Sequence, residues 1–216
     1  MKILVLDNYD SFTYNLVHIL KYVTDDPVHV FRNDEIPVAE VQKYDRILIS
    51  PGPGIPDEAG IMKELIEKYA STKSILGICL GMQGIAEVFG AKIYNLDKVY
   101  HGIESEITIL NTNDPLFHNI PEHIQGGRYH SWAVDLKSLP GELEMTAKDN
   151  SGIAMAIRHQ NYDVKGLQFH PESVMTPYGK HILLNWLQPD NKEISFPRSH
   201  HASYDIHDTK SGGLFS

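Results

Sequence analysis

Residues 77–81, Gly-Ile-Cys-Leu-Gly, constrain the fold of this chain more than any other stretch of its sequence. The mostly apolar residues 74–76 lead into them as a predicted strand, and residues 82–89 lead out as a predicted helix. A sharp strand-to-helix turn through Gly-x-Cys-x-Gly has the layout of a nucleophile elbow. A Cβ at either glycine would clash in so crowded a turn. The pattern therefore predicts that the Cys79 side chain is raised above a sheet, at the N-terminus of a helix.

Cys79 is the only cysteine in the 216 residues, so the chain has no partner for an intramolecular disulfide. At a helix N-terminus the dipole and the unpaired N–H groups stabilise negative charge, which suits a thiol nucleophile. The alternative is a buried cysteine that acts as a small hydrophobic residue. Because Gly77 and Gly81 flank the turn, we favour the nucleophile.

The first half of the chain alternates predicted strands with predicted helices. The predicted strands are the continuous apolar run at residues 3–6 and the mostly apolar residues 28–31 and 46–49. Helical spacing or composition predicts helices at residues 16–23, 38–43 and 58–69. This alternation is typical of an α/β fold with an open, mostly parallel central sheet flanked by helices.

After residue 90 the pattern becomes β-rich, and turn signals separate the short predicted strands. These strands are residues 104–110, 127–130, 133–136, 142–147, 153–158 and 166–169. An amphipathic helix at residues 178–187 closes one predicted domain, 1–187. Residues 188–216 are polar and rich in His, Ser and Asp, which by itself is typical of a flexible tail.

The net charge of −9 argues against nucleic acid or an anionic membrane as the main partner. No apolar run approaches the roughly 18 residues that a membrane span needs. The opening apolar run stops at Asp7, too early for the core of a signal peptide. We therefore expect a cytoplasmic protein that binds neither nucleic acid nor membrane.

A Gly- and Pro-rich loop, residues 50–56 (Ser-Pro-Gly-Pro-Gly-Ile-Pro), follows the predicted strand 46–49 directly. Such a loop brings backbone close to a ligand at the carboxyl end of a strand, where open α/β sheets bind ligands. It lacks the Gly-Lys-Ser/Thr ending of a nucleotide-phosphate loop. The alternative is a plain strand-to-helix connection.

His170 and Glu172, in the run Gln-Phe-His-Pro-Glu at residues 168–172, form the second chemical motif. A cysteine nucleophile needs a base, and the base needs a third group that fixes its tautomer. Residues two apart in an extended segment point to the same side. Glu172 is thus placed to accept the imidazole N–H of His170 while the other ring nitrogen faces Cys79.

With these motifs, residues 1–187 resemble the class I (triad) glutamine amidotransferases, whose fold is flavodoxin-like. Residues 7–16 (DNYDSFTYNL), 50–54 (SPGPG) and 128–131 (RYHS) are similar to the glutaminase subunits (component II) of anthranilate synthase and aminodeoxychorismate synthase. Two positions depart from that subgroup. Met82 stands where His is more usual and resembles the imidazole glycerol phosphate synthase glutaminase, and Ile103-Glu104 replaces a more usual Lys-Thr.

The resemblance implies a glutaminase with the triad Cys79, His170 and Glu172 as its catalytic residues. Cys79 would attack the side-chain amide carbon of L-glutamine, and a glutamyl thioester would form and be hydrolysed. The backbone N–H of Leu80 and that of Gly54 or Gly52 would bind the oxyanion, because Pro53 has no N–H.

By the same likeness, the substrate's amino acid end would be held by Gln83 and by the backbone of Ser131 and Trp132. The alternatives are an exposed helix position for Gln83 and a core anchor for Trp132.

Ammonia released in solvent would become ammonium, so a synthase must receive it, and this chain holds no second catalytic domain. The resemblance implies that the hetero-oligomeric partner is a chorismate-binding synthase subunit. It also implies no metal or cofactor in this chain, although a chorismate-using partner is expected to need Mg²⁺.

Three alternatives remain open at this point. One is a glutaminase subunit for another acceptor, such as imidazole glycerol phosphate synthase. The second is a free-standing γ-glutamyl thiol hydrolase. The third is a regulatory subunit with a relic site, which we disfavour because Cys79, His170 and Glu172 are all present. The sequence does not separate anthranilate from aminodeoxychorismate synthesis, and one subunit serving both fits it equally.

Overall fold

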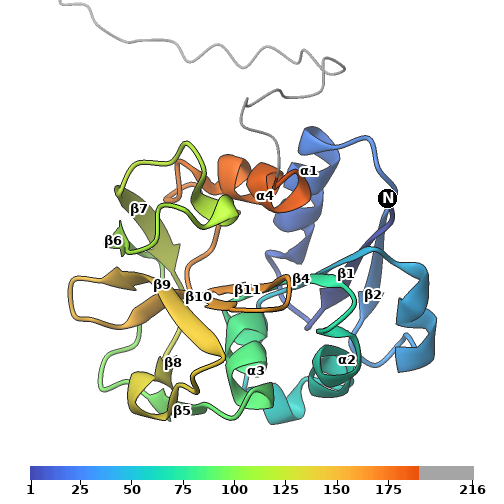
Figure 1. The fold of residues 1–216 in the computed structure, drawn as a ribbon, viewed down its shortest axis with the longest axis horizontal. Helices are drawn as coiled ribbons and strands as arrows, with labels where there is room; N and C mark the ends of the chain where they lie inside the picture. The colour runs from blue at the N-terminus through green and yellow to red at the C-terminus, as the bar shows by residue number, and fades with distance from the viewer. Residues whose placement is uncertain (190–216) are drawn as a thin grey trace, which may run out of the picture.

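A computed structural model describes residues 1–189 of the chain (Figure 1). The prediction of a tail at residues 188–216 therefore lies almost wholly outside the described residues. Within them, helices cover both faces of one large sheet, as expected for the α/β class.

The central sheet has nine strands in the order β2-β1-β3-β4-β11-β10-β9-β6-β7. Its first five members pair in parallel: β2 (Val28–Arg32), β1 (Ile3–Asp7), β3 (Arg46–Ile49), β4 (Ser74–Ile78) and β11 (Val164–Leu167). Their apolar side chains are largely buried because helices lie over both faces. The predicted parallel sheet is confirmed.

The predicted β-rich segment continues this same sheet in antiparallel pairs. The strands involved are β10 (Ala154–His159), β9 (Leu143–Asp149), β6 (Ile103–Ile109) and β7 (His123–Arg128). A separate antiparallel pair joins β8 (Trp132–Asp135) to β5 (Lys92–Asn95). The sequence analysis missed β5, which is short and mostly exposed and so lacks the apolar run that marks the buried strands.

Two helices pack on each face of the sheet (Figure 1). On one face lie α1 (Thr13–Val23) and α4 (Gly179–Leu187), and on the other lie α2 (Met62–Tyr69) and α3 (Leu80–Val88). The buried side chains divide accordingly into two apolar clusters, one on each face. Each helix thus buries the apolar stripe that its periodicity predicted.

The short helix predicted at residues 38–43 is present with the same bounds, as a 3₁₀ helix, Val38–Lys43. The helix predicted at 58–69 begins only at Met62, after a separate 3₁₀ turn at Pro56–Glu58. Further 3₁₀ turns lie at Pro115–Phe117 and Leu136–Ser138. Gly60 accounts for the late start of α2, because its φ of 51° lies outside the right-handed helical region.

The parallel register brings the chemical motifs together. Ile49 pairs with Gly77 across β3 and β4, and Leu167 pairs with Ile78 across β11 and β4. The carboxyl ends of these three strands therefore meet. The 50–56 loop, Cys79 and the segment 168–172 all leave the sheet at this edge.

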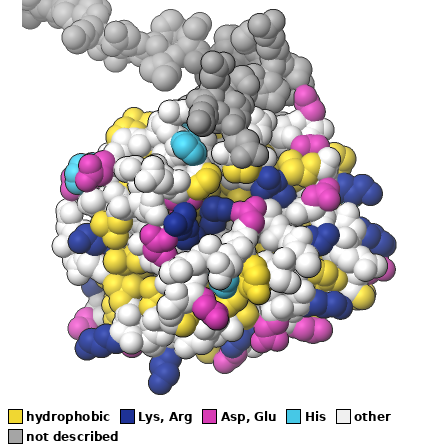
Figure 2. Space-filling model, viewed as in Figure 1, with side chains coloured by type: hydrophobic (Ala, Val, Ile, Leu, Met, Phe, Trp, Pro, Cys, Tyr) yellow, Lys and Arg dark blue, Asp and Glu magenta, His cyan; other side chains and the backbone are white. Residues whose placement is uncertain are grey.

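Among residues 1–189, none of the helices combines the length and apolarity that crossing a bilayer requires. Acidic and basic side chains are interspersed over the face drawn in Figure 2. The negative net charge is therefore not concentrated in one patch on this face.

Candidate active site

Cys79 sits at a sharp turn between the end of β4 and the start of α3. Its backbone has φ 52° and ψ −100°, in the positive-φ region that non-glycine residues rarely adopt. A Cβ on Gly77 would lie 2.4 Å from the carbonyl carbon of Gly81, and one on Gly81 would lie 2.8 Å from the Ile49 oxygen. The predicted elbow, with its requirement for both glycines, is confirmed.

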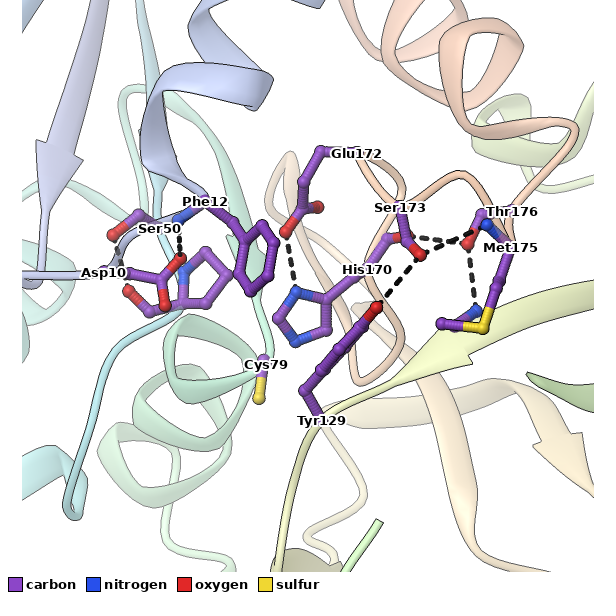
Figure 3. A network of polar contacts seen from close by, with 12 residues as sticks. Asp10, Phe12, Ser50, Cys79, Tyr129, His170, Glu172, Ser173, Met175 and Thr176 are labelled. Atoms are coloured by element: carbon purple, nitrogen blue, oxygen red, sulfur yellow. Dashed lines mark hydrogen bonds and ion pairs between the residues drawn. The ribbon is translucent and has the colours of Figure 1, made fainter. Parts of the chain in front are cut away.

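His170 and Glu172 form a buried pair next to this elbow (Figure 3). The distance from His170 Nδ1 to Glu172 Oε1 is 2.6 Å, and less than a twentieth of either side chain is exposed. The backbone of His170 is fixed on both sides, because its N–H donates to Gly127 O at 2.9 Å and its carbonyl accepts from Thr176 Oγ1 at 2.6 Å. Figure 3 shows the imidazole between Glu172 and Cys79.

The surroundings of His170 favour its charged form. Burial acts to lower the pKa of His170, but interactions with Cys79 and Glu172 outweigh it and raise the pKa to about 10. The imidazolium is therefore the stable form at neutral pH. It provides a proton close to the sulfur.

A cavity of about 180 Å³ opens in front of Cys79. Every residue predicted to hold glutamine or an oxyanion lies on its wall. The lining residues are Gly52, Pro53, Gly54, Cys79, Leu80, Gln83, Tyr129, His130, Ser131 and Trp132. His170 and Glu172 are not on this wall. The sulfur thus has the cavity on one side and the imidazole on another.

Gln83 is buried, with 3% of its surface exposed, so the alternative of an exposed helix position is wrong. Its Nε2 donates to the carbonyl of Trp132 at 3.0 Å and to Oε1 of Gln168 at 3.2 Å. Trp132 is only half-buried and belongs to neither apolar cluster, so it is not a core anchor. Its carbonyl, in contrast, is part of the polar wall of the site.

The 50–56 loop is held in place by the N-terminal turn. The N–H of Asn8 donates to Ser50 Oγ at 2.8 Å, and its Nδ2 donates to Ser50 O at 2.9 Å. Gly52 packs so tightly that a Cβ there would lie 2.6 Å from Asn8 O, and Gly54 has φ 74°. Leu80 is the first residue of α3, where backbone N–H groups lack intrahelical partners. These backbone groups border the cavity from two sides.

Two aromatic rings that the sequence analysis did not single out pack against His170. The Tyr129 ring lies edge-on with its centroid 4.9 Å from the imidazole, and the Phe12 ring lies edge-on at 6.4 Å. The Tyr129 hydroxyl is 3.5 Å from Ser173 Oγ. Asp10 accepts from the Phe12 N–H at 2.8 Å, and burial raises the pKa of its carboxyl against that hydrogen bond. Both rings belong to the motifs 7–16 and 128–131, but only the fold brings them to His170.

His130, also on the cavity wall, has its tautomer fixed by its neighbours. Arg128 Nε donates to His130 Nε2 at 3.1 Å, so Nδ1 carries the proton and donates to Trp132 O at 2.8 Å. Arg128 is itself buried, paired with Asp149 at 2.7 Å and placed over the Tyr100 ring. Burial and the charge of Arg128 lower the pKa of His130 to about 4. His130 is therefore neutral at physiological pH.

No cluster of three or more His, Cys, Asp or Glu side chains suited to a metal ion occurs among residues 1–189. The cavity wall instead offers a thiol, amides, an imidazole and backbone groups. This set of donors and acceptors suits a small polar molecule.

Comparisons with known proteins agree with this geometry. A family model described as glutamine amidotransferase class-I matches residues 4–188. A Bacillus subtilis protein named aminodeoxychorismate/anthranilate synthase component 2 is 42% identical over 194 residues, which cover 89% of this chain and 98% of that protein. A Porphyra purpurea protein named anthranilate synthase component 2 is 43% identical over 191 residues, covering 87% of this chain and 100% of that protein.

A solved structure from Thermoplasma acidophilum, assigned as part of a GMP synthase, has a similar fold. Its TM-score is 0.78 at 25% identity, and the match covers 88% of this chain and 93% of that one. The family match includes the elbow, the 50–56 loop and the segment with His170 and Glu172.

Proposed function

Because the chain belongs to the class I glutamine amidotransferase family, we propose that it is the glutaminase subunit of a chorismate-using synthase. The synthase would make anthranilate, aminodeoxychorismate, or both. One observation carries the chemistry: Cys79 stands at a strained elbow with a cavity of about 180 Å³ on one side and a Glu172-paired His170 on the other. The names of the relatives support the choice of acceptor.

In the first half-reaction the Cys79 sulfur attacks the side-chain amide carbon of glutamine. The carbonyl π electrons move onto oxygen and give a tetrahedral oxyanion. His170 protonates the amide nitrogen, the C–N bond breaks, and ammonia leaves a glutamyl thioester. Glu172 keeps the imidazole oriented and stabilises its charged form.

In the second half-reaction His170 accepts a proton from water, whose oxygen attacks the thioester carbon. The C–S bond breaks, glutamate leaves, and the sulfur regains its negative charge beside the imidazolium. The oxyanion of both steps needs donors that are already in place. We assign the N–H of Leu80 and that of Gly54 or Gly52 to this role, which their position on the cavity wall supports.

The amino acid end of the substrate is assigned to Gln83 and to the backbone of Ser131 and Trp132, which lie on the same wall. With Nε2 of Gln83 engaged by Trp132 O and Gln168, its Oε1 is the atom offered to the substrate's ammonium group. Mg²⁺, where the synthase reaction needs it, belongs to the partner in this proposal.

The test of the proposal measures glutamate release by the chain alone, with a chorismate-binding synthase subunit, and with that subunit plus chorismate. We expect slow release by the chain alone and faster release in the complex, most of all with chorismate. Full activity alone, unchanged by the partner, would favour a free-standing hydrolase. Stimulation only by an imidazole glycerol phosphate synthase partner would mean that Met82, and not the motif at residues 7–16, indicates the acceptor.

Cys79→Ser is the matched control in the same complex. It should abolish glutamine-dependent synthesis and leave synthesis from added ammonia intact, because the partner needs only ammonia. Equal loss of both activities would mean that Cys79 has a structural role instead.

A further inference from the structure

Gln168 is placed against the nucleophile by the register of the sheet. Leu167 of β11 pairs with Ile78 of β4, so the next residues on the two strands, Gln168 and Cys79, leave the sheet side by side. Gln168 is fully buried. Its Nε2 lies 3.5 Å from Cys79 Sγ, a hydrogen-bond distance for an acceptor as large as sulfur.

The orientation of the Gln168 amide is fixed by a chain of contacts that begins at a backbone carbonyl. The carbonyl of Trp132 can only accept, so the atom of Gln83 that lies 3.0 Å from it is the donor Nε2. The same Nε2 lies 3.2 Å from Gln168, so the Gln168 atom facing it is the acceptor Oε1. The opposite end of that amide, the NH₂ group, is thereby turned toward the sulfur.

We propose that Gln168 is a catalytic residue whose amide N–H stabilises negative charge on the Cys79 sulfur, and that Gln83 is a positioning residue that fixes the direction of this donor. A hydrogen bond to a charged acceptor is stronger than one to its neutral form. Gln168 therefore favours the thiolate over the thiol without carrying a charge of its own. Its relevance to glutamine hydrolysis rests on the proposed function, whereas its effect on the sulfur does not.

The titratable groups around Cys79 define what a pH profile would report. His170 faces the sulfur, with Glu172 bonded to its far nitrogen and Asp10 nearby. Tyr129 and His130 lie on the cavity wall. All of these groups remain when Gln168 is replaced. Removing its amide should shift the profile of the sulfur without removing a titration step.

The experiment follows alkylation of Cys79 by iodoacetamide against pH in the full chain, for wild type and Gln168→Met. Methionine preserves an unbranched side chain of similar length and has no N–H donor. We expect the midpoint of the alkylation profile to rise by about one pH unit, so that the rate at pH values below the wild-type midpoint falls about tenfold. A thermal melt of each sample checks folding.

A second variant, Gln83→Met, leaves Gln168 in place but removes the group that orients it. It should raise the midpoint by a smaller amount, and it decides the question if Gln168→Met does not fold. The matched control is Asn185→Leu, which removes a different buried amide, bonded to the carbonyls of Leu116 and His118 at 3.1 and 2.9 Å. That variant should lower the melting temperature and leave the profile unchanged.

Wild-type midpoints in the folded Gln168→Met and Gln83→Met variants would overturn the proposal, and a lowered melting temperature alone would reduce Gln168 to a packing residue. Alkylation needs no glutamine and no partner. If the variants shift the alkylation profile but the wild-type chain releases no glutamate even with the synthase subunit and chorismate, the proposed function is refuted and the role of Gln168 stands. If the wild-type complex releases glutamate but the variants leave the alkylation profile unshifted, the proposed function stands and the role of Gln168 is refuted.

Discussion

Glu172 contacts the His170 imidazole at 2.6 Å, which orients the ring and helps to favour its charged form. Glu172→Gln retains a hydrogen-bonding group but not the negative charge that stabilises the imidazolium. We expect glutamate release to fall by about 10³-fold or more. The measurement is steady-state glutamate release in the complex, with a thermal melt on the same sample. A rate near that of wild type would show that another acid orients His170.

The same substitution should change how stability depends on pH. The pKa of His170 is raised from 6.5 in the unfolded chain to about 10 in the fold. The stabilisation from its charged form is therefore fully present below pH 6.5 and is lost as the pH rises toward 10. Between pH 6.5 and 10, the free energy of unfolding measured with urea should fall less steeply with pH in Glu172→Gln than in wild type. Parallel slopes would contradict this account.

His130 has the opposite shift and predicts a pH dependence on the acid side. Its pKa falls from 6.5 to about 4 because it is buried beside Arg128. Between these two values the unfolded chain binds a proton that the fold excludes, so stability falls as the pH falls from 6.5 to 4. The full loss corresponds to about 3 kcal/mol.

His130→Gln should remove that loss, because a glutamine amide offers both an acceptor for Arg128 and a donor for Trp132 O. Urea unfolding at pH 7, 5.5 and 4.5 checks this expectation. The free energy of unfolding should depend less steeply on pH in His130→Gln than in wild type, rather than differ by a constant amount at every pH. A constant difference across the range would assign the acid sensitivity to other groups.

At the scale of elements, the elbow depends on the close approach of β4 and α3. A Cβ on Gly77 would meet the Gly81 carbonyl carbon at 2.4 Å and its oxygen at 2.5 Å, and backbone atoms cannot move aside as a flexible side chain does. Gly77→Ala should therefore lower the free energy of unfolding by about 1–3 kcal/mol and displace Cys79. Urea unfolding and iodoacetamide reactivity would report the two effects.

Gly141→Ala is the control for that substitution. A Cβ at Gly141 meets no atom within 4 Å, and its φ is not positive. We expect a change within about 0.5 kcal/mol and unaltered reactivity of Cys79. Equal effects at the two glycines would mean that the elbow tolerates a Cβ despite these short distances.

At the scale of the whole molecule, the proposed function implies coupling between the cavity and the partner's surface. Binding couplings are reciprocal, so a partner that improves glutamine binding is itself bound more tightly when the site is filled. A glutamine analogue attached to Cys79 should lower the Kd of the synthase subunit by about 5- to 150-fold. Titration of the synthase onto labelled and unlabelled chain measures this, with Cys79→Ser as the chain that cannot be labelled. An unchanged Kd would separate the site from the partner.

The larger architecture illustrates where sequence patterns succeed. The buried strands β1, β3 and β4 consist mainly of apolar residues, and such runs are recognisable in a sequence because a strand covered on both faces has no polar side. The exposed strand β5 carries no such pattern and was missed. Similarly, Gly60, with φ 51°, separates a 3₁₀ turn from α2 where the sequence had predicted one continuous helix.

The sequence by itself determined the local chemistry of the site. The glycines around Cys79 dictated a strand-to-helix turn, because only residues without a Cβ fit it, and the spacing of His170 and Glu172 placed both on one side of an extended segment. Each of these two signals is contained in a few consecutive residues. Both depend on local backbone geometry, which a short sequence pattern is enough to specify.

Only the tertiary structure decided which side chains surround those groups. Gln83 and Gln168 are 85 residues apart, and Gln168 and Cys79 are 89 apart, yet all three join in one buried network. The rings of Phe12 and Tyr129 likewise pack against His170 although all three residues are far apart in the sequence. Such contacts follow from the pairing of β4 with β11 and from the packing of loops at one edge of the sheet. No local pattern encodes them, because their free energy comes from burial and hydrogen bonding that exist only after the chain has folded.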